Sequence, residues 1–156
     1  RCAEQVAALI ERVHDAGRLH LAAEMLGLAA EAFDRAVDYL KTRVQFGRKI
    51  GEFQALQHRA AILFGEIEIA ASVVLKAATL HDAGDARFPA YASLAKAKVG
   101  EVAKHVTAEA VHFHGGLGMT DDFDLGFYLK RARAAAEHLG DTAFHQERYA
   151  VLESAG

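Results

Sequence analysis

A chain of 156 residues, 52% hydrophobic and 25% charged, is long enough for one domain with a substantial core. Its net charge of −3 argues against a nucleic-acid-binding surface, and no apolar run reaches the length of a membrane helix or signal peptide. The single Cys2 excludes an internal disulfide bond and fits a reducing compartment. We therefore expect one cytoplasmic domain, and the first residue, Arg1 rather than Met, indicates a piece of a longer protein.

Three long stretches carry apolar residues three or four positions apart, which predicts amphipathic helices. The first stripe is Leu19, Ala22, Leu26, Ala29, Phe33, Val37 and Leu40, and the second is Leu56, Ala60, Leu63, Ile67, Ala70, Val74 and Ala77. The third stripe is Ala95, Val99, Val102, Val106, Ala110 and Phe113. A short turn from His81 to Phe88 joins the second helix to the third, which Pro89 opens.

Three glycines between positions 115 and 118 should end the third helix. Residues 124–133 are predicted to form a fourth helix and residues 141–152 a fifth, with no alternating pattern that would indicate strands. Because short connections make neighbouring helices antiparallel, we expect an all-α, up-down four-helix bundle with a short extra C-terminal helix. The bundle should occupy residues 15–156, and residues 1–14 are either a linker from a preceding domain or a lead-in to the first helix.

The loop after the first long helix concentrates side chains that suit an anionic ligand with an aromatic ring. Arg43 can hold a phosphate through two parallel hydrogen bonds, and Phe46 offers a ring face to a base. Gly47 and Gly51 let the backbone turn. Alone, Arg43 would be interpreted as a cation at a helix C-terminus, but Phe46 and Gln54 in register favour a cofactor contact.

An Arg-x-x-Phe-Gly-x-x-Ile-x-x-x-Gln motif runs from Arg43 to Gln54 and resembles the flavin-contacting loop of the acyl-CoA dehydrogenases, in their C-terminal helical domain. Upstream, Asp15-Ala-Gly-Arg18 is similar to the Asp-x-x-Arg with which that family contacts acyl-CoA. The Gly-Gly-x-Gly at positions 115–118 is similar to the turn that receives the adenosine part of the flavin. With the basic end of the fourth helix, the resemblance covers nearly the whole chain.

The resemblance implies FAD held without a covalent bond and desaturation of an acyl-CoA thioester between its α and β carbons. It implies acyl-CoA contacts from Asp15 and Arg18, an acceptor such as an electron-transfer flavoprotein, and a homo- or hetero-oligomer, because the loop reaches a neighbouring subunit's flavin in the family. The family's site also needs an N-terminal helical domain and a small β domain, so this chain alone should be inactive. The implied cofactor contacts are Arg43, Phe46, Gln54, His112 (an amide in relatives), Gly115 and Gly116.

The chain departs from the family at the catalytic carboxylate. The ungapped match to the usual catalytic Glu is Leu139, and the alternative position, on the first helix, is Gly17. Neither residue can accept a proton, which leaves Glu24, Asp141 and Glu137 as candidates. Asp141 also fits a helix N-cap and Glu137 a solvated surface charge. The simpler hypothesis is that a partner subunit supplies the base.

Two other functions remain open from the sequence. Glu11 with His14 and Glu109 with His112 have the Glu-x-x-His spacing of di-iron bundles, for which Glu66 is the available lone carboxylate. Because the usual base is missing, the chain also fits a non-catalytic subunit or assembly module. Retention of the Arg-x-x-Phe-Gly loop argues against pure assembly.

Overall fold

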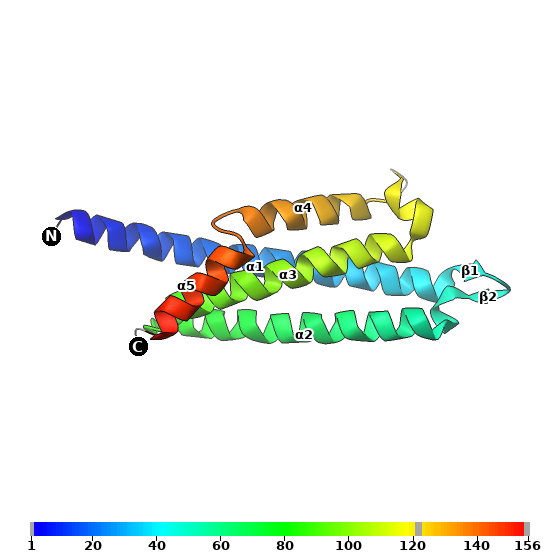
Figure 1. Cartoon of the computed structure of the whole chain (residues 1–156), viewed down its shortest axis with the longest axis horizontal. Coiled ribbons are helices and arrows are strands. Elements are labelled where there is room, and N and C mark those ends of the chain that lie inside the picture. Colours follow the sequence, from blue (N-terminus) through cyan, green and yellow to red (C-terminus); the bar gives the residue numbers. More distant parts are fainter. Residues whose placement is uncertain (1, 121–122, 155–156) are drawn as a thin grey trace.

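The computed structural model describes residues 2–120 and 123–154 and shows an elongated helical bundle (Figure 1). Helices α1 to α4 run alternately up and down, and α5 crosses the N-terminal part of α3 (Figure 1). This confirms the predicted all-α bundle with its extra C-terminal helix. In the described ranges no helix is both long and apolar enough to span a membrane. The helices are α1 Cys2–Thr42, α2 Gln54–Asp82, α3 Phe88–Phe113, α4 Leu125–Glu137 and α5 Thr142–Ser154.

The centre of the bundle is α3, which packs against each of the other four helices. Every residue of its predicted stripe is buried. On α1 the most buried face is shifted toward smaller residues, and Leu26, Phe33 and Val37 of the predicted stripe are only half-buried. Small side chains allow the axes of α1 and α3 to approach closely. The buried residues of this face of α1 are Leu19, Ala22, Met25, Ala29, Ala32, Ala36 and Leu40.

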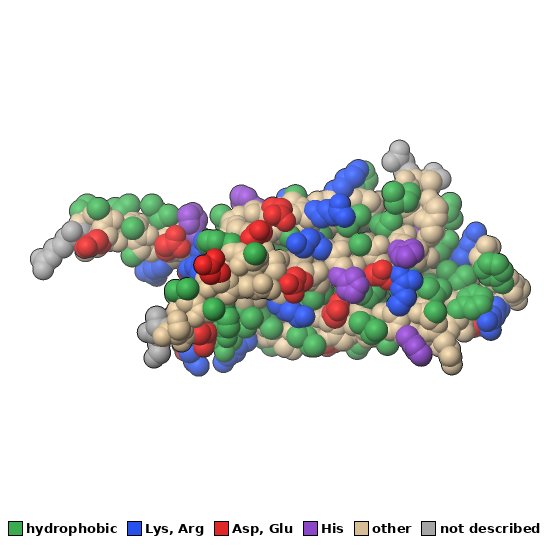
Figure 2. Space-filling view, in the orientation of Figure 1, with side chains coloured by type: hydrophobic (Ala, Val, Ile, Leu, Met, Phe, Trp, Pro, Cys, Tyr) green, Lys and Arg blue, Asp and Glu red, His purple; other side chains and the backbone are tan. Residues whose placement is uncertain are grey.

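The first segment of the chain is helical and continuous with α1, so the lead-in contains no break at residue 14. It projects beyond the other helices, and residues 2–13 are exposed (Figures 1 and 2). Apolar side chains line part of this arm (Figure 2). The division into a lead-in and a bundle domain stays a prediction.

The loop between α1 and α2 contains a hairpin that the sequence pattern did not predict. Strands β1 (Val44–Gln45) and β2 (Arg48–Lys49) pair antiparallel, with Gln45 opposite Arg48. The two residues between them, Phe46 and Gly47, have φ values of 54° and 78°, as a type I′ turn requires. Strands of two residues are too short to show alternation. A 3₁₀ turn, η1 (Ile50–Glu52), then leads into α2.

The turn after α3 is a second 3₁₀ segment, η2 (Gly115–Met119), and it packs closely at one position. A Cβ atom on the buried Gly118 would overlap the Val111 carbonyl oxygen and lie 3.0 Å from the Cβ of His114. A Cβ atom on Gly116 would meet nothing within 4 Å. Gly118 therefore allows the chain to fold back onto the end of α3.

We expect Gly118→Ala to lower the free energy of unfolding by about 1–3 kcal/mol, because backbone must move to accept the methyl group. Gly116→Ala, two residues away in the same turn, is the matched control and should unfold within about 0.5 kcal/mol of the wild type. Urea unfolding followed by circular dichroism measures both. Equal stability of the two variants would contradict the close packing at Gly118.

Candidate functional site

A hollow of about 530 Å³ lies at the hairpin end of the bundle, between the end of α1, the start of α2 and the turn after α3. It brings together four of the six predicted cofactor residues, Arg43, His112, Gly115 and Gly116. Arg43 immediately precedes β1, and His112 lies in the last turn of α3. The wall also includes the rings of Tyr39, Phe113 and His114 and the side chain of Arg59.

The two arginines of this hollow differ in their charge partners. Arg59 donates from Nε to Oε2 of Glu109 at 2.7 Å and from Nη2 to the same oxygen, so a carboxylate neutralises it. Arg43 makes no ion pair or side-chain hydrogen bond with any residue in 2–120 or 123–154. The guanidinium of Arg43 is therefore available to an anionic ligand.

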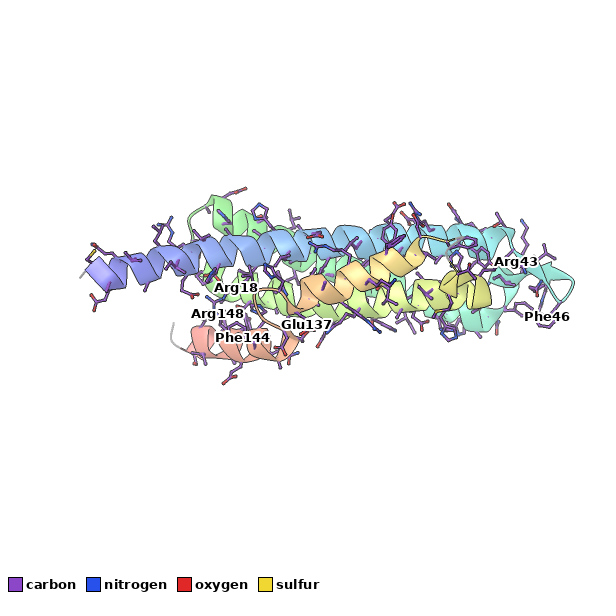
Figure 3. All side chains as sticks on the ribbon, turned by 90° about the horizontal axis from the view of Figure 1, so that it is seen from above. Arg18, Arg43, Phe46, Glu137, Phe144 and Arg148 are labelled. Atoms are coloured by element: carbon purple, nitrogen blue, oxygen red, sulfur yellow. The ribbon has the colours of Figure 1, made fainter. Side chains whose placement is uncertain are left out.

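Phe46 and Gln54 do not line the hollow. Phe46 is at the tip of the hairpin, 92% exposed, at the end of the molecule beyond Arg43 (Figure 3). Its ring meets that of Phe53 edge-on, with 6.2 Å between centroids. Gln54 is exposed at the first position of α2. Their predicted cofactor contacts stay predictions, and any such contact must involve a molecule that covers the hairpin from outside.

The predicted acyl-CoA residues lie well away from the hairpin, near α5 (Figure 3). Asp15 and Arg18 are 2% and 5% exposed, so they are not a surface ion pair. Arg18 Nη1 donates to Asp15 Oδ1 at 2.7 Å, and Arg148 of α5 donates from Nη2 to Oδ2 at 3.1 Å. Asp15 is thus a buried carboxylate held between two guanidinium groups. Its predicted role toward substrate stays a prediction.

A chain of hydrogen bonds continues from Arg148 to the loop between α4 and α5. Arg148 Nη1 donates to the hydroxyl oxygen of Ser93 at 2.6 Å. His145 Nε2 lies 3.0 Å from the Leu139 carbonyl, which can only accept, so Nε2 carries the proton. Nδ1 of His145 then accepts from Ser93, at 3.3 Å. The chain fixes the backbone of Leu139, whose φ of 59° is in the left-handed region.

The ammonium group of Lys96, on α3, also binds the loop between α4 and α5. It donates to the carbonyl oxygens of Ala136 at 2.8 Å and Gly140 at 3.0 Å, although the side chain is only 1% exposed. Burial lowers the pKa of Lys96 to about 8. Burial, with the nearby charge of Lys96, lowers the pKa of His145 to about 4. His145 is therefore neutral in the folded protein at pH 7.

The two positions at which the resemblance would place a catalytic base face each other. A Cβ atom on Gly17 would lie 2.9 Å from Cδ1 of Leu139. The space that an acidic side chain at position 17 would enter is therefore filled by leucine. Leu139 therefore approaches the Gly17 backbone at the two positions where the resemblance implies a carboxylate.

The three candidate bases, Glu24, Asp141 and Glu137, are either engaged in other hydrogen bonds or exposed. Glu24 is paired with Arg131, Oε1 to Nε at 2.5 Å and Oε2 to Nη2 at 2.8 Å. That hydrogen bonding lowers the pKa of Glu24, whereas a general base works best with a pKa near the working pH. Asp141 accepts from the Phe144 amide at 2.8 Å, which is an N-cap of α5. Glu137 is exposed in the last turn of α4.

The di-iron arrangement is not assembled. Glu11 and His14 are on the projecting part of α1, whereas Glu109 and His112 are at the opposite end of the bundle. Glu66 pairs with His105 instead, at 2.9 Å. Among residues 2–120 and 123–154, no three His, Cys, Asp or Glu side chains form a group that could hold a metal ion. The metal alternative is therefore wrong for the described residues.

Sequence reasoning missed most of the buried polar groups of this region. Lys96 lies within the apolar run of α3, next to the stripe residues Ala95 and Val99, and was a detectable signal of a buried cation. His145 and Arg148 are three residues apart on α5, but the polar surroundings of that helix gave no sign of burial. Their partners are distant in sequence, so only the fold brings them together.

The neutral state of His145 predicts a specific acid sensitivity. Between pH 6.5 and about 4 the unfolded chain binds a proton at this residue that the folded chain does not. The free energy of unfolding should therefore fall by about 3 kcal/mol as the pH drops through this range. Above pH 6.5 His145 is neutral in both states, so it should add no pH dependence there. In His145→Gln that part of the slope should vanish, whereas the exposed His138→Gln should follow the wild type. Parallel wild-type and His145→Gln curves in urea unfolding would contradict the assignment.

A family model described as acyl-CoA dehydrogenase, C-terminal domain, matches residues 7–150. Acyl-CoA dehydrogenase IpdE2 of Mycolicibacterium smegmatis is 42% identical over 126 residues, covering 81% of this chain and 39% of IpdE2. Butyryl-CoA dehydrogenase from Megasphaera elsdenii superposes with a TM-score of 0.89 at 31% identity, over 92% of this chain and 37% of that one. A variant of the Tcur3481-Tcur3483 steroid acyl-CoA dehydrogenase superposes with a TM-score of 0.87 at 32% identity, over 91% of this chain and 39% of that one.

The chain thus spans less than two fifths of the length of these relatives. The matched region coincides with the helical bundle, and the bundle carries the hollow at the hairpin end. The chain belongs to the acyl-CoA dehydrogenase family, of which it forms the C-terminal helical domain.

Proposed function

We propose that this chain is the part of an FAD-dependent acyl-CoA dehydrogenase that holds the cofactor's adenosine and phosphate end and joins the subunits. The observation that carries the proposal is the hollow at the hairpin, which Arg43, without a side-chain partner in residues 2–120 and 123–154, lines together with aromatic residues and a glycine turn. These groups match the chemistry of a dinucleotide, whose phosphates need a cation and whose rings need flat apolar surface.

The proposed cofactor site uses few residues in distinct roles. Arg43 would bind phosphate oxygens through its guanidinium group. Gly115, with a φ of 59°, and Gly116 would bring backbone close to the cofactor. When bound, FAD supplies the acceptor for the hydride that leaves the β carbon of the acyl group. An electron-transfer flavoprotein is the proposed final acceptor.

The length of α1 supports an oligomer. Arg18 lies in α1 and Arg43 directly follows its last residue, Thr42, so the two arginines are 25 positions apart along an uninterrupted helix, a rise of about 37 Å. This is longer than an extended dinucleotide, so a flavin held at Arg43 cannot react beside Arg18 of the same chain. We infer that the Arg43 hollow and the exposed Phe46 serve the acyl-CoA site of a neighbouring subunit. One of the matched structures is named for Tcur3481 and Tcur3483 together.

A second candidate role is a subunit that binds flavin but has no base of its own. The contact between Gly17 and Leu139 favours this role. Neither position that the resemblance implies for the carboxylate has an acidic side chain, and Leu139 fills the space beside Gly17. Glu24, Asp141 and Glu137 are each engaged elsewhere or exposed. In this second role, a carboxylate of a partner subunit would remove the α proton of the acyl-CoA.

The first test is cofactor retention by the complete parent protein. Arg43→Ala should weaken FAD binding about 10- to 100-fold, the usual effect of removing a charge-assisted contact, with an unchanged melting temperature. Arg48→Ala is the matched control, because Arg48 belongs to the same hairpin but stacks on Phe53, 4.1 Å from the ring centroid. FAD affinity is measured by fluorescence titration of the deflavinated protein. An unchanged affinity in Arg43→Ala would contradict the site.

The second test asks whether the parent chain contains a base. Mixed anaerobically with straight, branched and ring-bearing acyl-CoAs, the wild type alone should keep its flavin absorbance. Leu139→Glu should lose absorbance with at least one of them, whereas Leu139→Gln, of the same shape without a base, should not. Leu139 already has a positive φ, so neither variant adds backbone strain. Loss of absorbance in the wild type would show a base in this chain and reject the partner hypothesis.

A further inference from the structure

Arg59 of α2 joins three side chains at the rim of the hollow. Its guanidinium group pairs with Glu109, which is 19% exposed, and lies 5.0 Å from the centroid of the Phe113 ring. Its Nη2 also lies 2.9 Å from Nδ1 of His112. All three partners come from the last two turns of α3, so one cation from α2 fixes the end of α3.

The contact with Arg59 decides which nitrogen of His112 carries the proton. A guanidinium group has only donors, so Nδ1 of His112 must accept the hydrogen bond. In a neutral imidazole the proton is then on Nε2. Since His112 lines the hollow, Nε2 is the ring nitrogen left to donate to a ligand there.

The charge of Arg59 is not free for a ligand in the same way as that of Arg43. Glu109 accepts hydrogen bonds from Nε and Nη2 of Arg59, and His112 accepts from Nη2 as well. The two arginines of the hollow therefore have different functions. Arg43 can meet a phosphate directly, whereas Arg59 acts on the side chain beside it.

We propose that Arg59 is a positioning residue for the cofactor: it holds His112 in the Nε2–H form and orients that N–H toward a phosphate or sugar oxygen of the bound dinucleotide. This rests on the proposed binding of FAD at the hollow. It also explains how a histidine can stand where relatives have an amide. An imidazole anchored through Nδ1 presents one donor in a fixed direction, as a side-chain amide would.

The test uses the complete parent protein, deflavinated and titrated with FAD, with the melting temperature of each variant as a control for folding. Arg59→Lys keeps a positive charge beside Glu109 but loses the planar fork that reaches His112 at the same time. We expect Arg59→Lys and His112→Ala each to weaken FAD binding about three- to tenfold, the usual effect of one hydrogen bond. Their combination should bind no more than about twofold weaker than His112→Ala alone, because the two residues act as one unit.

Two further variants make the result specific. His112→Gln should bind FAD nearly as well as the wild type, because its amide can accept from Arg59 and still donate to the ligand. Arg131→Lys is the matched control, since Arg131 makes a similar two-pronged pair with Glu24 away from the hollow, and should leave affinity unchanged. Should Arg59→Lys fold poorly, the pair Arg59→Gln with Glu109→Gln leaves no unpaired charge and should weaken binding as His112→Ala does.

Additive losses in the combined variant would overturn the positioning role, because Arg59 would then act on the cofactor without His112. Full affinity in Arg59→Lys would overturn it as well. If the wild type binds FAD and Arg43→Ala loses it, such results reject only the role of Arg59. A wild-type protein that takes up no FAD would reject the flavin site and this inference together.

Discussion

The closeness of α1 and α3 is the constraint on which the rest of the structure depends. Alanines at positions 22, 29, 32 and 36 of α1 are fully buried, and α1 packs against α3 more extensively than any other pair of helices in the described structure. Small side chains bring the two axes together, and close packing over several turns leaves little freedom for either helix to slide or rotate. The remaining helices then pack on a rigid pair, and the residues of the proposed sites lie at both ends of that pair.

Buried polar contacts attach α5 and the α4–α5 loop to the pair of helices α1 and α3. At the α5 end, Asp15 and its two arginines attach α5 to α1, and Lys96 with His145 hold the backbone of the α4–α5 loop. Burying such charges is costly, so the geometry must satisfy nearly every donor and acceptor. The result is a loop whose unusual backbone at Leu139 is fixed from two sides. The surface of this loop is therefore set by the residues beneath it.

Sequence reasoning predicted the helices and the bundle because hydrophobic periodicity is a local signal that spans many residues. The short turns at Gly84 and at the glycines after Phe113 are local signals too. The exact burial of α1 was less predictable, since choosing between overlapping stripes of leucine and alanine depends on the partner helix. The hairpin and the Arg59–Glu109–His112 group could not be predicted, because two-residue strands show no pattern and the group joins α2 to α3 across 50 positions.

The uninterrupted helix α1 has a consequence for how such proteins can vary. It carries Arg18 and ends at Thr42, directly before Arg43, so a single residue inserted into or deleted from the helix between them would turn one end by about 100° relative to the other. Changes of about 7, 11 or 18 residues would restore the relative orientation of the two ends, because they come close to whole turns. The 25-residue spacing therefore sets both the distance and the relative orientation of the two ends. In the proposed oligomer it would fix how far, and in which direction, the Arg43 end of one subunit can reach toward the Arg18 end of another.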